Sequence, residues 1–268
     1  MNYLLSEIFI YPVKSLAGIS LKEAEVTDRG LKYDRRWMIT DENNLYITQR
    51  IVPQMALINV RIDNQTLVLS HKKTGDSFSI DTGKEPYKKS KVIVWNDPVA
   101  ADFVSPDADS WLSEALKIKC RLVHMPERAN RYVDKKYASK NEVVSFADGF
   151  PFLVIGQASL DDLNNRLEEK LPMNRFRPNF VFAGGEPFDE DRMKSFKLGD
   201  VIFYPVKPCS RCIITTTNQE TAQRGKEPLK TLSGYRKIET KIMFGQNLLH
   251  EGKGIVKVGE ELKNLEWK

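Results

Sequence analysis

The sequence predicts a mainly β protein with a few helices, of the α+β class. Short segments that alternate apolar and polar residues follow one another through residues 4–95, with turn residues about every ten positions. This pattern is typical of a small β-barrel or sandwich. Near Ser105 the pattern changes to acidic residues followed by a helical apolar spacing. We therefore predict two domains, a β-barrel-like domain over residues 1–104 and a second domain over residues 105–268 packed on it.

The first predicted strand covers residues 4–11 and ends before Pro12, which lacks the N–H that a sheet ladder needs. The segments that follow have similar alternation and are separated by Gly, Pro, Asn or Asp residues typical of turns. These predicted strands cover residues 19–26, 37–40, 45–48, 56–62, 66–70, 77–80 and 92–95.

Helices are predicted at two places in the second domain. The first carries Asp107 and Asp109 in its first turn, where carboxylates interact favourably with the helix dipole. The second covers residues 159–171, because Ser159 and Asp162 form a capping-box pattern and leucines follow at helical spacing. Strands are predicted over 120–124, 152–155, 180–183, 201–206 and 213–217, and a polar loop over 127–142.

The composition is that of an ordinary soluble globular protein. Of 268 residues, 29% are charged and 41% hydrophobic, and the net charge is +5 at pH 7. No basic run of five or more residues occurs, and Trp37 and Trp95 are interpreted as core residues, so no nucleic acid binding is expected. The first ten residues lack signal-peptide features, and no apolar run approaches a membrane span. Three cysteines without a framework pattern indicate a reducing compartment, so we expect a cytoplasmic protein without membrane association.

Two of the cysteines, Cys209 and Cys212, are spaced as C-x-x-C. Pro208 is predicted to end the preceding strand, and the β-branched segment 213–217 is predicted to form the next one. The cysteines would then lie on a tight connection between two strands. Arg211 adjoins Cys212 in the sequence, and a neighbouring cation lowers the pKa of a thiol.

The spacing of these cysteines leaves four interpretations open. A structural zinc site needs about four Cys or His ligands, and the other Cys and His residues are isolated in the sequence. A redox pair of the thioredoxin type belongs at the start of a helix. Two ordinary buried cysteines are the third interpretation. The fourth is a single soft thiolate on a transition metal whose other ligands come from a cofactor.

Several polar side chains at predicted strand ends suit an anionic ligand. They are Lys14, Ser15, Arg35, Arg177 and Asn179. A phosphate or pyrophosphate is bound well by bidentate arginines, a lysine and hydroxyl donors. The glycine-rich nucleotide-binding loops and the G-x-S-x-G motif of Ser-His-Asp hydrolases do not occur in this sequence.

Motifs spread along the chain point to one family. In order, they are Tyr11-Pro12-Val13-Lys14-Ser15, Asp34-Arg35-Arg36-Trp37, Thr48-Gln49-Arg50, Asp148-Gly149-Phe150-Pro151-Phe152, Asn174-Arg175-Phe176-Arg177-Pro178-Asn179, Cys209-Ser210-Arg211-Cys212 and Phe244-Gly245-Gln246-Asn247. This series resembles the MOSC family, the molybdenum cofactor sulfurase C-terminal family, preceded by its N-terminal β-barrel domain. The resemblance spans residues 4–262, and it is greatest to the amidoxime-reducing components and their bacterial relatives. It implies a β-barrel MOSC domain over residues 105–268.

The resemblance implies a molybdopterin-type molybdenum cofactor held between the two domains. Cys212 would be the protein ligand of the molybdenum, and Asp148 would orient a water or shuttle a proton beside it. The implied cofactor contacts are Lys14, Ser15, Arg35, Gly149, Phe150, Arg177, Asn179, Ser210, Arg211 and Asn247. Cys209 is then expected to be structural.

The implied reaction is the two-electron reduction of an N-hydroxylated small molecule, such as a hydroxylamine, an amidoxime or an N-hydroxylated base. The sequence has no C-x4-C-x2-C iron–sulfur pattern, so the electrons are expected from a separate electron-transfer protein. The alternative is a non-catalytic module that binds the molybdenum cofactor, or carries sulfur on Cys212, for other molybdoenzymes.

Overall fold

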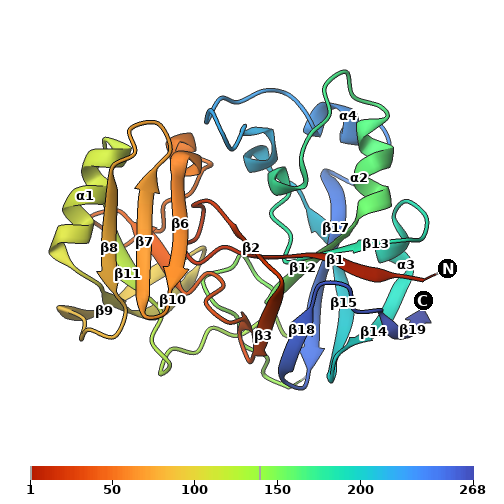
Figure 1. The fold of residues 1–268 in the computed structure, drawn as a ribbon, viewed down its shortest axis with the longest axis horizontal. Coiled ribbons are helices and arrows are strands. Elements are labelled where there is room, and N and C mark those ends of the chain that lie inside the picture. The colour runs from red at the N-terminus through yellow and green to blue at the C-terminus, as the bar shows by residue number, and fades with distance from the viewer. Residues whose placement is uncertain (1, 139) are drawn as a thin grey trace.

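The computed structural model describes residues 2–138 and 140–268, and strands dominate it, as the sequence predicts. The chain folds into two lobes that lie side by side (Figure 1). Residues 37–124 form the smaller lobe, and the larger lobe contains both ends of the chain. Residue 139, in the loop predicted over 127–142, lies outside the described residues. Within the described ranges, no helix combines the length and apolar character needed to cross a membrane.

The smaller lobe contains two antiparallel sheets and a helix. Its elements are β5 Trp37–Thr40, η1 Pro53–Leu57, β6 Ile58–Asp63, β7 Thr66–His71, β8 Ser77–Asp81, β9 Lys88–Val94, β10 Asp97–Phe103, α1 Pro106–Leu116 and β11 Arg121–His124. One sheet has the order β5-β11-β10-β9 and the other β6-β7-β8. The buried residues Leu112 and Leu116 of helix α1 belong to the same hydrophobic core as Leu122 of β11.

The larger lobe is built around a sheet of nine strands. These are β1 Leu4–Ile10, β2 Ile19–Leu21, β12 Phe152–Gly156, β13 Phe180–Ala183, β14 Met193–Leu198, β15 Val201–Ser210, β16 Lys237–Ile238, β17 Lys241–Glu251 and β19 Lys263–Trp267. Their order is β19-β14-β15-β17-β12-β13-β1-β2, with β16 paired to β17. Strands β12 and β13 run parallel, and the other described pairs of this sheet are antiparallel.

Smaller elements complete the larger lobe. A three-stranded sheet consists of β3 Glu23–Thr27, β4 Gly30–Leu31 and β18 Gly254–Lys257, in the order β18-β3-β4. The helices are α2 Gln157–Asn164, η2 Met173–Arg175, α3 Asp189–Arg192, η3 Ile213–Thr216 and α4 Leu229–Ser233.

Strands from distant parts of the chain pair with each other in the larger lobe. Leu4 of β1 lies opposite Ala183 of β13, and Glu25 of β3 lies opposite Ile255 of β18. In the smaller lobe, β11 pairs with both β5 and β10. Segments from both sides of residue 104 therefore contribute to each lobe. The division into residues 1–104 and 105–268 stays a prediction.

Aromatic rings hold the centre of the large sheet. The rings of Phe152, Phe180 and Phe203 are fully buried, with centroids 5.2–5.4 Å apart. Burying one such ring stabilises the fold by roughly 2–3 kcal/mol. Strand β12 follows directly after the segment Asp148–Phe150, so this core gives a rigid base to the loop that precedes it.

Helix α1 confirms its prediction. Asp107 and Asp109 lie in its first turn, and the hydroxyl of Ser105 accepts a hydrogen bond from the backbone N–H of Ala108. A capping oxygen at this position satisfies one of the unpaired N–H groups of the first turn. The local sequence thus determines where this helix begins.

The predicted end of the strand at Pro208 is wrong. Strand β15 continues through Pro205 and Pro208 to Ser210, opposite β17. Its register shifts between Pro205 and Lys207 and again between Pro208 and Ser210. Such bulges leave a residue outside the regular ladder, which accommodates a proline that cannot donate. Cys209 therefore lies on the strand itself.

The strand predicted over 213–217 is also wrong, because η3 occupies this segment. The hydroxyl of Thr215 donates to the carbonyl of Cys212, and that of Thr216 donates to the carbonyl of Ile213, both at 2.9 Å. Threonine side chains that bond nearby carbonyls compete with sheet formation. Here they favour a helical turn directly after Cys212.

The helix predicted over 159–171 is shorter than expected, because α2 ends at Asn164. The Asn164 side chain accepts from the N–H of Leu171 at 2.8 Å and donates to its carbonyl at 3.1 Å, which folds the chain back. Ser159 forms no capping box, since its hydroxyl donates to the buried carboxylate of Glu190 at 2.8 Å.

Two predicted strands of the first half differ in detail. Residues 45–48 make only isolated bridges, from Leu45 to Ile93 and from Tyr46 to Thr40, and the segment 19–26 is divided into β2 and β3. Strands β4, β10, β14, β16, β17, β18 and β19 were not predicted from the sequence.

Strands β12 and β17 approach each other closely at Gly245, which leaves no room for a side chain. Its φ is +80°, and an added Cβ would lie 2.6 Å from Cγ1 of Ile155 and 2.8 Å from the carbonyl oxygen of Val154. Gly75 has a φ of +78° but no atom within 4 Å of an added Cβ. We expect Gly245→Ala to lower the free energy of unfolding by about 3 kcal/mol, and Gly75→Ala by about 1 kcal/mol, because only the first adds overlap to backbone strain. Urea unfolding measures both, and equal losses would contradict this packing.

Candidate functional site

All twelve site residues predicted from the sequence line one pocket where the two lobes meet. Most come from the ends of strands or the loops beside them. Lys14 and Ser15 follow β1, Arg35 precedes β5, the segment Asp148–Phe150 precedes β12, and Arg177 and Asn179 precede β13. Ser210 ends β15, Arg211 and Cys212 follow it, and Asn247 lies on β17. The large sheet therefore gathers segments that are far apart in the sequence around one cavity.

The pocket carries a strong excess of positive charge. Among the described lining residues, the cations are Lys14, Arg35, Arg50, Arg177 and Arg211, and the one acidic residue is Asp148. Five positive charges and one negative charge give the described lining a formal net charge of +4. A concave surface with this charge attracts and concentrates anions.

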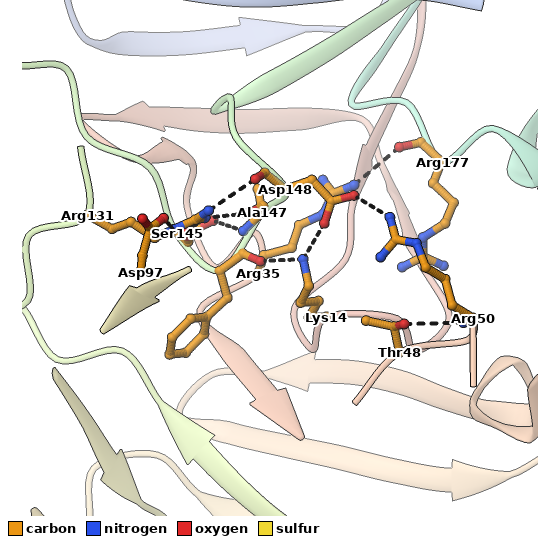
Figure 2. Close-up of polar contacts among 11 residues, drawn as sticks. Lys14, Arg35, Thr48, Arg50, Asp97, Arg131, Ser145, Ala147, Asp148 and Arg177 are labelled. Carbon is orange, nitrogen blue, oxygen red and sulfur yellow. Dashed lines mark hydrogen bonds and ion pairs between the residues drawn. The ribbon is translucent and has the colours of Figure 1, made fainter. Parts of the chain in front are cut away.

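Asp148 lies at the centre of this network. Lys14 Nζ donates to Asp148 Oδ1 at 2.6 Å and to the carbonyl of Phe146 at 2.7 Å. Arg50 Nη2 donates to Asp148 Oδ2 at 3.3 Å, and Figure 2 shows these two cations reaching the carboxylate from different sides. Partial desolvation in the pocket would raise the pKa of Asp148, but Lys14 and Arg50 outweigh it and hold the pKa well below its usual range. The carboxylate is therefore ionised at neutral pH, so it can accept hydrogen bonds but has no proton to donate.

Lys14 is buried, with 5% of its surface exposed. Burial lowers the pKa of Lys14 to about 8, although the carboxylate of Asp148 acts in the opposite direction. The ammonium group therefore carries its charge below about pH 8 and loses it as the pH rises through this value.

This titration predicts a pH dependence for anion binding. We expect the affinity of the cofactor-free protein for inorganic pyrophosphate to fall by about fivefold as the pH rises from about 7 to 9, because Lys14 becomes neutral. The variant Lys14→Arg stays charged over this range and also controls for the titration of pyrophosphate itself. Calorimetry on both proteins measures the difference. An identical pH profile in wild type and Lys14→Arg would contradict the prediction.

Three lining residues have a left-handed backbone. The φ angles of Ser15, Arg35 and Arg177 are +68°, +49° and +56°. This conformation costs a residue with a side chain roughly 1–2 kcal/mol relative to the right-handed one. Glycine would avoid that cost. Such strain concentrates at functional sites, where the side chain is needed despite it.

Arg35 and Arg177 both contact the ring of Tyr11. Their guanidinium carbons lie 4.3 and 4.2 Å from the ring centroid. Burial is the main cause that lowers the pKa of Arg177 to about 10, with Tyr11 opposing the shift and Arg35 adding to it, so Arg177 remains charged at neutral pH. Arg35 Nη1 also donates to both oxygens of Asp34, at 2.8 and 2.6 Å. Tyr11 and Asp34 belong to the quoted motifs, but their support of the two arginines was not predicted from the sequence.

Asn179 and Asn247 are already engaged within the protein. The amide oxygen of Asn179 accepts from Arg35 Nη1 and from the N–H of Leu153, both at 3.2 Å, and its amide nitrogen donates to the carbonyl of Phe9 at 3.1 Å. Asn247 Nδ2 donates to a carbonyl of β15 at 3.1 Å. Asn179 therefore connects Arg35 to β1 and β12.

The two cysteines of the C-x-x-C pair share one wall of the pocket. Contrary to the sequence-based expectation, Arg211 turns towards Cys209, with Nη1 2.9 Å from Sγ, while its Nη2 donates to the carbonyl of Phe176. The cation that acts on Cys212 is Arg50. Burial would lower the pKa of Arg50, but the carboxylate of Asp148 and the sulfur of Cys212 raise it. Among the described residues, no cluster of three or more His, Cys, Asp or Glu side chains is placed to hold a metal ion.

Arg50 is the lining cation that the sequence-based assignment missed, although it belongs to the quoted Thr48-Gln49-Arg50 motif. The preceding Gln49 is fully buried and donates to the carbonyl of Ser15 at 2.8 Å and to the amide oxygen of Gln219 at 3.1 Å. Arg224 donates to the backbone carbonyl of Arg50 at 2.7 Å. These contacts fix the Arg50 backbone beside the pocket.

Several donors at the pocket are free to bind a ligand. Two buried groups, Nη1 of Arg50 and Nε of Arg211, have no hydrogen-bond partner in the described part of the chain. No hydrogen bond described for residues 2–138 and 140–268 involves the guanidinium of Arg177. Unpaired buried donors are costly and usually indicate an absent partner. This donor set fits an anionic group with several acceptor oxygens.

Comparison with known proteins identifies the class. The MOSC N-terminal beta barrel domain matches residues 2–119, and the MOSC domain matches residues 141–263. With this fold and pocket, the chain is a MOSC protein that carries the N-terminal domain.

Relatives that match nearly the whole chain show which MOSC proteins it is similar to. It is 34% identical to "Mitochondrial amidoxime-reducing component 1" of Mus musculus over 274 residues, covering 96% of this chain and 80% of the relative. The Homo sapiens protein of the same name is also 34% identical, over 275 residues, 96% of this chain and 81% of its own. "Molybdenum cofactor sulfurase" of Arabidopsis thaliana is 31% identical over 276 residues, 93% of this chain but 33% of that protein. The chain belongs to the MOSC family, together with the amidoxime-reducing components.

Proposed function

We propose that this chain is a molybdenum cofactor-dependent oxidoreductase that reduces N-hydroxylated compounds with electrons from a separate donor protein. The observation that carries the proposal is that all twelve predicted residues, Cys212 among them, line one cationic pocket. Identity of 34% across 96% of the chain to a protein named for amidoxime reduction supports the same activity.

The residues at the pocket fit a molybdopterin-type cofactor. Cys212 would provide a soft thiolate ligand, which suits a transition metal with sulfur ligation. The anionic tail would be held by Lys14, Ser15, Arg35 and Arg177, whose three positive charges and one hydroxyl match a phosphate. Further contacts with the pterin or its phosphate would come from Gly149, Phe150, Asn179, Ser210, Arg211 and Asn247.

When bound, a molybdenum cofactor would supply the two-electron redox chemistry that the reduction of an N–O bond needs. The residues of the chain itself would orient the substrate and a nearby water. Asp148, ionised by Lys14 and Arg50, would accept a hydrogen bond from a water or from a substrate N–H. Lys14 Nζ, which donates to Asp148 Oδ1 at 2.6 Å, would hold that carboxylate in place. We therefore assign orientation of the substrate or water to Asp148, and support of Asp148 to Lys14.

The test uses protein purified from a host that makes the cofactor. Molybdenum and pterin content are measured, and reduction of benzamidoxime is followed with a chemical reductant in place of the donor protein. We expect turnover in proportion to bound molybdenum. Protein that holds molybdenum but gives no turnover would reject the enzymatic function. A persulfide on Cys212 in such protein would support the carrier role, which the 31% identity to a molybdenum cofactor sulfurase favours.

The electron donor and the place of the protein in the cell are part of the same proposal. A separate electron-transfer protein and a cytoplasmic location are the expectations from the sequence. Fractionation of cells that express the chain, followed by a search for proteins that reduce it, tests both.

A further inference from the structure

Trp95 has a backbone conformation that is unfavourable for tryptophan, and its large apolar side chain is exposed. It is the first residue of the two-residue turn between β9 and β10, where Val94 pairs with Asp97. Its φ is +57°, a conformation that favours glycine or asparagine in such turns. Its side chain is 43% exposed, so its interpretation as a core residue is wrong. Neither the turn nor burial in a core explains a tryptophan here.

The contacts of the Trp95 ring lead to the pocket. The guanidinium carbon of Arg50 lies 4.6 Å from the ring centroid, within the range of a cation–π interaction. Arg50 in turn donates to Asp148. The ring of Tyr46 lies 5.5 Å from that of Trp95, and Lys14 Nζ lies 5.8 Å from the Tyr46 ring. Both cations that bind the carboxylate of Asp148 therefore contact this pair of aromatic rings.

The residue that follows this turn, Asp97 of β10, makes a second contact that leads to the pocket. Asp97 accepts from Nε of Arg131 at 2.8 Å, and Arg131 is buried, with 5% of its surface exposed. Arg131 donates to the carbonyls of Ser145 at 3.2 Å, of Ala147, and of Asp148 at 3.0 Å (Figure 2). The tip of the β9–β10 hairpin thus supports the segment that carries Asp148 as well as the cations around it.

Strain at Trp95 parallels the strain in the pocket. Ser15, Arg35 and Arg177 adopt the same left-handed conformation. In each case a side chain occupies a backbone conformation that glycine would adopt at lower cost. Trp95 differs because it does not line the described pocket and reaches it only through Arg50 and Tyr46.

We propose that Trp95 is a positioning residue that holds the guanidinium of Arg50 against Asp148, so that the pocket is preorganised for an anionic cofactor. The inference rests on the proposed function only in taking the ligand to be that cofactor. A cation–π contact restricts the arginine to one orientation, and a donor fixed in advance loses less conformational freedom on binding. Without the indole ring, Arg50 would be free to turn away from the pocket.

Binding of inorganic pyrophosphate to the cofactor-free protein tests this proposal by calorimetry at pH 7. Trp95→Asn removes the ring and fits the left-handed backbone. We expect pyrophosphate affinity to fall about tenfold, while the midpoint of urea unfolding stays the same or rises. Trp95→Phe keeps an aromatic face and should retain most of the affinity. A residue with a merely structural role would lose stability in Trp95→Asn.

Trp267 provides a matched control at the far edge of the large sheet. Its side chain is 42% exposed, and its ring covers Arg192 at 5.2 Å. Trp267→Asn removes an equivalent pair and should leave pyrophosphate affinity unchanged. A double-mutant cycle tests whether Trp95 acts through Arg50. If Trp95 acts through Arg50, Trp95→Asn should cause little further loss in an Arg50→Gln background.

The outcomes separate the two proposals. Wild-type affinity in Trp95→Asn, with affinity lost in Arg177→Ala, would overturn the role of Trp95 and leave the proposed function intact. Full additivity in the cycle would also overturn it. If the wild-type protein binds neither pyrophosphate nor molybdopterin, the proposed function fails, and the role of Trp95 fails with it.

Discussion

Replacing Cys212 by serine removes most of the molybdenum from the purified protein, whereas Cys209→Ser retains most of it. We expect this result because a serine hydroxyl is a harder and much less acidic donor than a thiol, and molybdenum with sulfur ligation prefers a soft thiolate. The expected loss of bound metal is about tenfold or more. Elemental analysis and pterin fluorescence on the same samples measure it.

Cys209→Ser is a matched control, because both cysteines lie in the same pocket wall. Its hydroxyl still offers Arg211 an acceptor in place of the sulfur that now lies 2.9 Å from Nη1. Retention of metal in Cys212→Ser, with loss in Cys209→Ser, would mean that the wrong thiol is assigned. In that case Arg211, rather than Arg50, would be the arginine beside the metal ligand.

Arg177→Gly should separate cofactor retention from stability. The guanidinium of Arg177 contacts Tyr11 and no described acceptor, so its donors are available to an anionic ligand. A charge-assisted hydrogen bond to a charged group contributes about 1.5–3 kcal/mol, so we expect cofactor affinity to fall by about 10- to 150-fold. Glycine also relieves a φ of +56°. The urea midpoint of the cofactor-free protein should therefore stay the same or rise.

Molybdopterin content after dialysis measures the first effect and urea unfolding the second. Adding Arg35→Ala should reduce retention further, but it also leaves the buried carboxylate of Asp34 without its arginine, which costs stability. Arg35→Ala therefore belongs in a variant with Asp34→Asn. Unchanged molybdopterin content in Arg177→Gly would reject the assignment of this arginine to the anionic tail.

Local chemistry was enough to predict some elements. Helix α1 follows its cap at Ser105, and β5 occupies residues 37–40 as predicted. The site residues also meet as the motif resemblance implied, because most lie at ends of strands or beside them. These features depend on neighbouring residues or on the topology of one sheet.

Other features depend on contacts that the sequence does not reveal. Pro208 remains within β15 because bulges opposite β17 accommodate it. Arg211 turns to Cys209 rather than to its neighbour Cys212, and the carbonyl of Phe176 holds it there. The backbone of Arg50 is fixed beside the pocket by contacts of Gln49 and Arg224. In each case contacts with a distant segment decide the local structure.

The pairing of β1 with β13 has a consequence for biosynthesis. The chain is made from its N-terminus, so Leu4–Ile10 leaves the ribosome long before its partner Phe180–Ala183 exists. The pairing of β3 with β18 is delayed further, until Gly254–Lys257 has emerged. By contrast, the strands within residues 37–124 find their partners among themselves. The smaller lobe can therefore form first on the nascent chain. Strand β1 can pair early with β2, but its other edge stays open to misfolding and to chaperones until β13 has emerged.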